Sequence, residues 1–268
     1  MSEVTNDDLA DTLDGRYRFL RALAAEPSSK RALEDRLSVS RSTVDRAIRD
    51  LQSKSLVAYE DRTYHLTVTG RYGLSVHETA TDRLEALAEM SDDLSRLDDG
   101  TPLEAAFLVD AEVIRPSPRT PDAIVSRLFR SVRRADHVDG IAPVALMGHL
   151  TPFYSEATED GGTMRMLLDA ELFDDLVTDD DEPLRRGIDD PDVSLERATV
   201  PFGFGLWISK DGDDDAEAGV VIYSETGVKA VVVNDDSAAL SWAREQFERV
   251  AETAVSFEEA TATLTERR

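Results

Sequence analysis

The first part of the chain contains three stretches in which apolar residues recur at helical spacing. The first covers residues 14–25 and ends before Pro27, and the second is short and begins after Ser29. The third runs over residues 40–54 and follows the tight turn at 38–40. Serine before the second and third stretches suits the N-cap position, so the pattern predicts a succession of short helices.

The third predicted helix has two faces of different character. At about 100° per residue, its apolar side chains form one stripe, made of Val44, Ala47, Ile48 and Leu51. The opposite face carries Ser42, Arg46 and Arg49, with Asp45 beside them. Arginine can grip guanine through two hydrogen bonds or hold a phosphate, so such a helix after a tight turn suits the major groove of DNA.

Two β-rich runs follow, over residues 56–59 and 63–69, with a turn at 60–62. Three helices and a hairpin are the order of a winged helix-turn-helix, in which the wing covers 56–69. The residues predicted to contact DNA are Ser40, Arg41, Ser42, Thr43, Asp45, Arg46 and Arg49 in the helix, and Arg62 and Tyr64 in the wing. The alternative is a helical bundle whose arginines are only solvated.

Two motifs in this region carry a resemblance. The segment SSKRALEDRLSVSRSTVDRAIRDLQSKSLV and the following YHLTVTG resemble archaeal winged-helix transcription regulators. The resemblance implies that the helix at 40–54 reads the major groove of double-stranded DNA. It also implies that the wing at 56–69 lies on the backbone or in the minor groove.

The segment over residues 75–98 is predicted to be a linker helix. Its spaced apolar and small positions suit a helix–helix seam, and they are Ala80, Leu84, Leu87, Ser91 and Leu94. Two interpretations stay open: a seam between the subunits of a homodimer, or a connector that packs on its own C-terminal domain. The chain therefore divides into residues 1–74, a linker at 75–99, and residues 100–268.

The C-terminal part alternates between strand and helix patterns. Strands are predicted over 103–114, 137–146, 163–168, 202–209, 219–223 and 228–234, and helices over 121–134, 170–177 and 237–262. A turn at 224–227 joins the last two strands, with Gly227 supplying positive φ. The pattern predicts a mixed α/β sheet, so the whole chain is expected to be of the α+β or α/β class.

This part also carries a resemblance. The segments RSVRRADHVDGIAPVAL, VPFGFGLWIS, YSETGVKAVVVND and ALSWAREQF resemble the middle domain of archaeal methanogenesis and filament regulators, which are common in halophilic archaea. The resemblance implies transcription regulation with a sensor domain, and it supplies no ligand. The F-G of residues 204–205 departs from the P-F-G-L usual in that family.

The charge distribution supports a nucleic-acid partner. The chain has 30 basic and 55 acidic residues, a net charge of −25, with 4 Lys against 26 Arg. Residues 15–71 hold 12 basic and 7 acidic residues, a local net charge of +5. A basic island on such an acidic chain is expected to meet a polyanion. Acid excess with so little lysine indicates a halophilic protein, the alternative being an acidic interaction surface.

The search for catalytic and cofactor motifs excludes several classes of site. The chain has no cysteine, its four histidines form no zinc-binding pair, and no G-x-S-x-G elbow occurs. Gly203 and Gly205 lack the third glycine of a dinucleotide fingerprint, and 211–215 lacks the positions of a calcium loop. We therefore expect a non-enzyme without cofactor or metal. Without a membrane-spanning apolar run or a signal peptide, a cytoplasmic location is expected.

The predicted effector site lies at the ends of strands in the C-terminal domain. His149 and Asp169 each follow the carboxyl end of a predicted strand, where open α/β sheets tend to bind ligands, and Tyr154 is near His149 in sequence. The alternative for His149 is an ordinary structural histidine. The hypothesis is a homodimeric, sequence-specific transcription regulator that responds to a small molecule. The alternatives are an α/β enzyme with a winged-helix adaptor and a winged-helix module for protein contacts.

The acid excess generates a prediction about salt. Carboxylates repel one another in dilute buffer, and molar salt shortens the screening length to about 3 Å. The protein is expected to lose cooperative unfolding after dialysis into dilute buffer and to regain it in molar KCl. Circular dichroism during thermal unfolding measures this, and a stable cooperative fold in dilute buffer would contradict halophilic adaptation.

Overall fold

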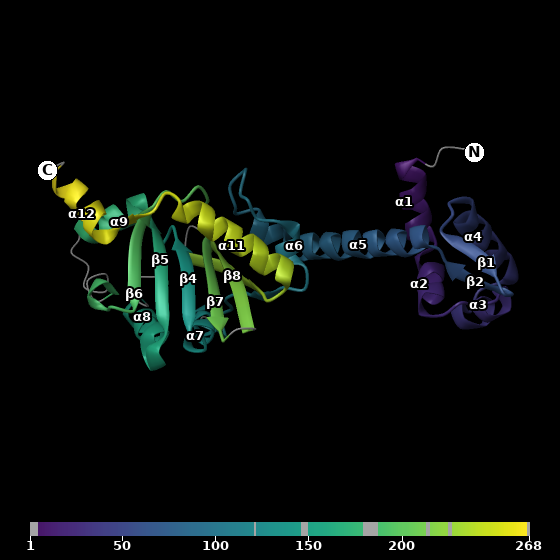
Figure 1. The fold of residues 1–268 in the computed structure, drawn as a ribbon, viewed down its shortest axis with the longest axis horizontal. Helices are drawn as coiled ribbons and strands as arrows, with labels where there is room; N and C mark the ends of the chain where they lie inside the picture. The colour runs from purple at the N-terminus through teal and green to yellow at the C-terminus, as the bar shows by residue number, and fades with distance from the viewer. Residues whose placement is uncertain are drawn as a thin grey trace. The chain divides into compact units, whose positions relative to one another are not determined.

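The computed structural model describes residues 5–120, 122–145, 150–178, 187–212, 215–224 and 227–266. The chain forms two compact units, Met1–Glu85 and Ala86–Arg268, which we describe separately (Figure 1). Helix α5 (Val68–Leu94) begins in the first unit and ends in the second.

The N-terminal unit contains the predicted succession of helices followed by a hairpin. Its elements before α5 are α1 (Asn6–Gly15), α2 (Tyr17–Ala25), α3 (Lys30–Leu37), α4 (Arg41–Ser53), β1 (Val57–Glu60) and β2 (Thr63–Leu66). Helix α1 was not predicted, because its apolar residues are few and its last residues were assigned to the next helix. The backbone changes direction at Arg16, which divides α1 from α2.

Local hydrogen bonds define the turn between α3 and α4. The Ser29 hydroxyl accepts from the Ala32 amide at 3.2 Å, and the Ser40 hydroxyl accepts from the Thr43 amide at 3.2 Å. Ser38 ends α3 in the left-handed conformation, with φ of 52°. These caps satisfy amide groups that an unprotected helix end would expose, so the three-residue turn fixes where α4 begins.

The predicted apolar stripe of α4 is buried. Val44, Ala47, Ile48 and Leu51 are each at most 1% exposed. They pack in one cluster with residues from α2, α3 and the hairpin, among them Leu20, Leu33 and Leu56. The hairpin is antiparallel, with Val57 opposite Leu66, and Asp61 and Arg62 turn it at positive φ. Because one face of α4 is committed to this core, the other must face solvent.

Helix α5 begins earlier and ends earlier than predicted. Residues 67–69 were assigned to the second wing strand, but the strand ends at Leu66. The Thr67 hydroxyl accepts from the Gly70 amide at 2.9 Å and so caps the helix. A Cβ at Gly70 would lie 2.0 Å from the Leu56 carbonyl oxygen, so glycine permits this close approach. The second half of α5 packs on the C-terminal unit through Ala86, Met90 and Leu94.

The C-terminal unit is built on an eight-stranded mixed sheet. Its strands are β3 (Glu112–Ile114), β4 (His137–Ala142), β5 (Thr163–Asp169), β6 (Val193–Ala198), β7 (Gly205–Asp211), β8 (Asp215–Ser224), β9 (Gly227–Asn234) and β10 (Val255–Ser256). They run in the order β10-β6-β5-β4-β7-β8-β9-β3. The pairs β4–β5 and β5–β6 are parallel and the others antiparallel, so the predicted mixed sheet is confirmed.

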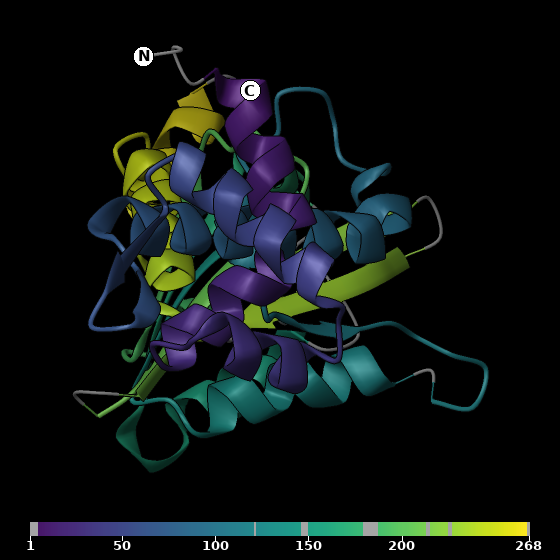
Figure 2. The same ribbon diagram turned by 90° about the vertical axis from the view of Figure 1, so that its right-hand side faces the viewer.

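Helices cover both faces of this sheet (Figures 1 and 2). They are α6 (Ala105–Leu108), α7 (Ala123–Arg133), α8 (Leu150–Thr158), α9 (Ala170–Thr178), α11 (Ser237–Ala251) and α12 (Phe257–Glu266), with a 3-10 turn at Glu159–Gly161. Alternate strand residues divide between the faces: Leu206 and Ile208 pack with α11, whereas Trp207 packs with Ile124 and Leu128 of α7.

Several elements of this unit differ from the prediction, and helix α8 is one that was not predicted. The stretch 103–114 is a short helix and a three-residue strand, because the Asn234 amide donates to the carbonyls of Phe107 and Val109 and holds the chain in a turn. Strand β6 was not predicted. The final helix was expected to be continuous over 237–262, but strand β10 interrupts it by pairing with β6. The middle of the predicted turn at 224–227 lies outside the described residues.

Candidate nucleic-acid interface

The exposed face of α4 carries three arginines. Arg41, Arg46 and Arg49 are all exposed, and none forms an ion pair or a hydrogen bond within the described part of the chain. Because the buried stripe holds the helix from behind, the three guanidinium groups reach solvent on the opposite side. This is the arrangement that the helical pattern predicted for these side chains.

The one acidic residue among them is neutralised. The Lys30 ammonium lies 2.6 Å from the Asp45 carboxylate. The hydrogen bond from Lys30 and the nearby positive charges, including those of Arg41 and Arg49, lower the pKa of Asp45. Asp45 therefore remains ionised, and its charge is offset by Lys30 rather than by the arginines.

Three hydroxyl groups gather at the N-terminus of α4. The Ser40 hydroxyl oxygen lies 2.9 Å from those of Ser42 and Thr43, and all three residues are exposed. The first amides of a helix and nearby hydroxyls are hydrogen-bond donors suited to phosphate. The structure thus brings these residues to the same end of α4 as Arg41.

The wing places its two predicted residues differently. Arg62 is exposed at the tip of the hairpin, where positive φ turns its backbone, and forms no ion pair in the described structure. Tyr64 is half-buried: its ring lies 4.7 Å from that of Tyr59, and its backbone exchanges two hydrogen bonds with Ser28 at 2.8 and 2.9 Å. Tyr64 thus ties the wing to the segment before α3, and a contact of its side chain with DNA stays a prediction.

One exposed arginine, Arg31, was not among the residues predicted to contact DNA. Arg31, on the first turn of α3, is exposed and without an ion-pair or hydrogen-bond partner among the described residues. Its neighbours on the same helix show why such a position is hard to assign: Arg36 is engaged by Glu26 and by the Ala22 carbonyl. Whether an arginine forms an ion pair with a distant residue can be seen in the folded structure but not in the sequence.

Of the three predicted effector residues, the structure describes Tyr154 and Asp169. His149 lies outside the described residues. Tyr154 on α8 is buried and lines an apolar cavity. The Asp169 carboxylate accepts hydrogen bonds from the amides of Glu171, at 3.0 Å, and Val200, at 3.3 Å, so it caps α9 and holds the segment after β6. A role of these residues in effector binding stays a prediction.

The apolar cavity has a volume of about 100 Å³ and lies between the sheet and helices α7 and α8. Six of the residues around it are Val125, Leu128, Phe153, Tyr154, Trp207 and Tyr223. Elsewhere in the described part of the chain, no group of three or more His, Asp or Glu side chains is arranged to hold a metal. No described helix is long and apolar enough to cross a membrane.

Comparison with protein families identifies the architecture. Residues 121–253 match the family described as the methanogenesis regulatory protein FilR1, middle domain. The matched range covers most of the C-terminal unit, which therefore resembles a FilR1 middle domain. Residues 6–89 match the HVO_A0261 N-terminal domain, which covers the four-helix and wing region and most of α5. The resemblance to archaeal regulators is thereby confirmed, and the halophilic character remains an expectation.

Two of the solved structures that match this chain have low sequence identity to it. One, described as TrmBL2, an archaeal chromatin protein with a novel mode of DNA binding, is 14% identical, with 94% of this chain and 100% of that chain covered and a TM-score of 0.41. NucT from Helicobacter pylori is 11% identical, covering 55% and 99% of the two chains with a TM-score of 0.44. A search of the curated proteins finds no match.

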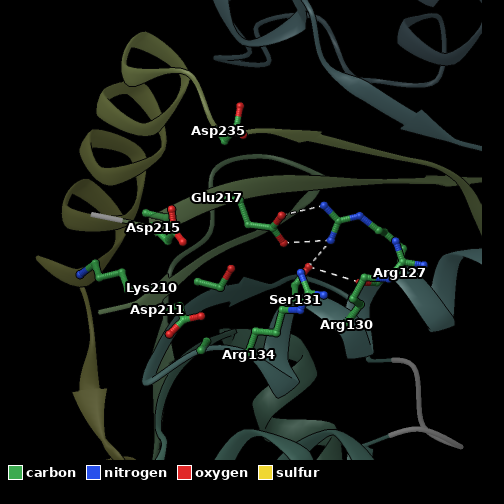
Figure 3. A pocket seen from close by; sticks show the side chains of 12 residues that line it. Arg127, Arg130, Ser131, Arg134, Lys210, Asp211, Asp215, Glu217 and Asp235 are labelled. Atoms are coloured by element: carbon green, nitrogen blue, oxygen red, sulfur yellow. Dashed lines mark hydrogen bonds and ion pairs between the residues drawn. The ribbon is translucent and has the colours of Figure 1, made fainter. Parts of the chain in front are cut away.

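The C-terminal unit also has a polar cavity of about 340 Å³ beside α7 (Figure 3). The buried Arg127 donates to both carboxylate oxygens of Glu217, at 2.9 and 2.7 Å, to Glu112 at 2.8 Å and to the Ser131 hydroxyl at 2.6 Å. Burial alone would raise the pKa of Glu217, but the hydrogen bonds from Arg127 and Ser131 outweigh it and lower that pKa. The network joins α7 to β3 and β8.

This network generates a stability prediction. Glu217→Gln leaves the Arg127 guanidinium buried with one charged partner, so the free energy of unfolding is expected to fall by about 3 kcal/mol near neutral pH. Because the pKa of Glu217 is lowered in the folded state, its contribution is complete above the unfolded pKa of about 4.3 and disappears as the pH falls through the folded value. The difference between the two proteins should therefore shrink in acid.

Urea unfolding in molar KCl at several pH values measures this difference. Glu245→Gln is the matched control, because Glu245 pairs with Arg249 on an exposed helix surface and should contribute less than about 1 kcal/mol. Equal small effects of the two substitutions would contradict the role assigned to the Arg127 network.

Proposed function

We propose that the protein is a sequence-specific DNA-binding regulator of transcription, in which α4 enters the major groove and the wing lies on the backbone or in the minor groove. The observation that carries the proposal is the face of Arg41, Arg46 and Arg49, which is unpaired, exposed and held in place by a buried stripe. The match to a regulatory family supports it. The proposed role is binding without catalysis.

Electrostatics explains why base contacts should matter here. The local charge of +5 over residues 15–71 favours DNA, while the rest of the acidic chain repels it. At molar salt the screening length falls to about 3 Å, which weakens phosphate attraction at longer range. Direct bidentate contacts between arginine and guanine act at hydrogen-bond distance, and each contributes roughly 1–3 kcal/mol of discrimination.

The first test replaces the exposed arginines of α4. In Arg46→Ala/Arg49→Ala the fold should persist, because both side chains point away from the core. Loss of a bidentate base contact should cost about 1–3 kcal/mol and relax preference at one position of the operator. Fluorescence anisotropy with a footprinted operator at several salt concentrations measures this, and circular dichroism checks folding.

Two further variants make this test specific. Arg62→Ala should weaken binding to all sequences alike and reduce the salt slope by about one, as expected for a phosphate contact. Arg96→Ala, an exposed arginine beyond α5, should leave operator binding unchanged. If the folded double variant binds the operator as tightly as wild type does, α4 is not the reading helix.

We also propose that the protein acts as a homodimer, joined through the first half of α5. Four large apolar side chains there are strongly exposed: Val68 60%, Tyr72 72%, Val76 64% and Leu84 66%. With the exposed Ala80 they recur every fourth residue and form one ridge. Ridges of this spacing pack into each other when two helices cross at about −50°.

A second copy of the chain is the partner that the charge pattern favours. On a helical projection, Glu78, Asp82 and Glu85 lie on the side of α5 opposite Ala80 and Leu84. Two copies can therefore join their ridges without bringing these carboxylates together, although each chain carries −25. Leu94, the last position of the predicted seam, packs on the C-terminal unit instead.

The dimer proposal predicts a change of oligomeric state. Val76→Glu/Leu84→Glu places four buried carboxylates in the proposed dimer and should convert it to monomer. Sedimentation velocity in molar KCl measures this, with Ser75→Glu, an exposed position beside the ridge, as control. A double variant that sediments like wild type would mean that the ridge is not the interface.

The third part of the proposal is regulation by a small-molecule effector bound to the C-terminal unit. The predicted residues are His149, Tyr154 and Asp169, and Asp169 lies at the carboxyl end of the parallel strand β5, where sheets of this type bind ligands. Among them Tyr154 lines the apolar cavity described above.

A further inference from the structure

The apolar cavity lies where the topology favours a ligand. Ile141 and Ala142 end strand β4, and Leu168 lies next to the end of the parallel strand β5. Strand β7 begins at the same edge, with Leu206 opposite Ile141. The cavity is thus at the carboxyl end of the parallel strands, whereas the polar cavity beside Arg134 and Lys210 lies at their amino end.

Two residues that line the cavity, Trp207 and Tyr223, carry a hydrogen-bond donor. Trp207 lines the cavity and is 4% exposed, and its indole Nε1 is buried without a hydrogen-bond partner in the described structure. Tyr223 also lines the cavity and donates only a long hydrogen bond, 3.5 Å, to the Val144 carbonyl. Burial raises the pKa of Tyr223, so its hydroxyl keeps its proton at neutral pH. A buried N–H without a partner costs roughly 1–3 kcal/mol.

Gly205 makes room for the tyrosine. A Cβ on Gly205 would lie 2.7 Å from the Tyr223 hydroxyl oxygen and 3.3 Å from Val221. A side chain there would therefore displace the hydroxyl from the cavity wall. This close approach gives a physical reason for glycine at the position where the Phe204-Gly205 pair departs from the family pattern.

We propose that this cavity binds a small, neutral, largely apolar molecule that carries one hydrogen-bond acceptor, and that this molecule is the effector of the proposed regulator. The acceptor receives the Tyr223 O–H, and the apolar body contacts Leu128, Phe153 and Tyr154. The regulatory half of this inference rests on the proposed function. The binding half rests on the cavity alone.

Size and charge define the ligand class. A cavity of about 100 Å³ limits the ligand to at most a single six-membered ring or a short branched chain, since an apolar cavity of roughly 150 Å³ holds benzene. An ionised ligand is disfavoured, because an unpaired charge in an apolar site loses its hydration. A sugar is disfavoured in the same way, because most of its hydroxyl groups would find no partner.

Cyclohexanone and methylcyclohexane are matched probes of this site. They have the same number of non-hydrogen atoms, but only the ketone offers an acceptor. The chain has two tryptophans, and Trp242 already donates its indole N–H to the Pro102 carbonyl at 2.9 Å on the other face of the sheet. In a ¹H–¹⁵N spectrum, cyclohexanone should shift the Trp207 indole signal saturably, because Trp207 lines the cavity, while the Trp242 signal stays in place.

Ligand affinities of the wild-type protein and of cavity variants test the proposed site. Methylcyclohexane should bind at least tenfold more weakly than the ketone, and cyclohexanecarboxylate should not bind. Ala142→Leu should reduce cyclohexanone affinity at least tenfold by filling the cavity, whereas Ala135→Leu, at the opposite end of β4, should not. Val125→Leu provides a second filling variant if Ala142→Leu does not fold.

The proposal fails if millimolar cyclohexanone leaves the Trp207 signal unchanged, or if both filling variants bind it as wild type does. Operator affinity is measured separately, with and without cyclohexanone. A protein that binds the probe but no operator overturns the proposed function and leaves the ligand site standing. Operator binding that the bound probe does not alter overturns the effector role.

Discussion

The burial of one stripe of α4 is the constraint on which the N-terminal unit depends. Val44, Ile48 and Leu51 have almost no solvent-exposed surface, and their removal from water determines the rotation of the helix about its axis. The arginines on the far side consequently point outward, without a hydrogen bond or ion pair to any other residue that the structure describes. Packing, rather than electrostatics, orients the arginine face of α4. The ion pair with Lys30 offsets the negative charge of Asp45 beside these arginines.

In the C-terminal unit, arginine–carboxylate pairs connect the elements of the fold. An acidic chain with few cations must hold its sheet and helices together without uncompensated buried charge. Arg127 does this by taking two carboxylates from different strands, and Arg165 and Glu196 form a similar paired contact between β5 and β6 at 2.7 Å. Arginine suits this work better than lysine because its planar fork can satisfy two acceptors at once. The polar cavity is the solvent-facing side of such a network.

The sequence predicted correctly those features of a helix or hairpin that depend only on the residues within that element. The stripe of α4 and the serine caps are local patterns, and both were predictable. The early start of α5 was not, because Gly70 and Gly73 oppose a helix by propensity and are favoured by contacts with Leu56 and Leu13. Strand β6 was missed because half of its residues are charged or polar, and Arg197 finds its partner Asp174 only in the folded unit. The apolar cavity was beyond prediction for the same reason, since its wall comes from several separate segments.

The contact at Gly70 has a mechanical consequence. With the Leu56 carbonyl oxygen 2.0 Å from the place of a Cβ, the first turn of α5 cannot rotate about its axis without driving a neighbouring side chain into that oxygen. The close approach of the Gly70 backbone to the Leu56 backbone therefore fixes the rotation of α5 about its axis relative to the wing. In a dimer joined along the ridge of α5, the separation of the two reading helices would be a rigid dimension of the protein. Such a protein would bind operators with one spacing between the two half-sites and would not adapt to other spacings.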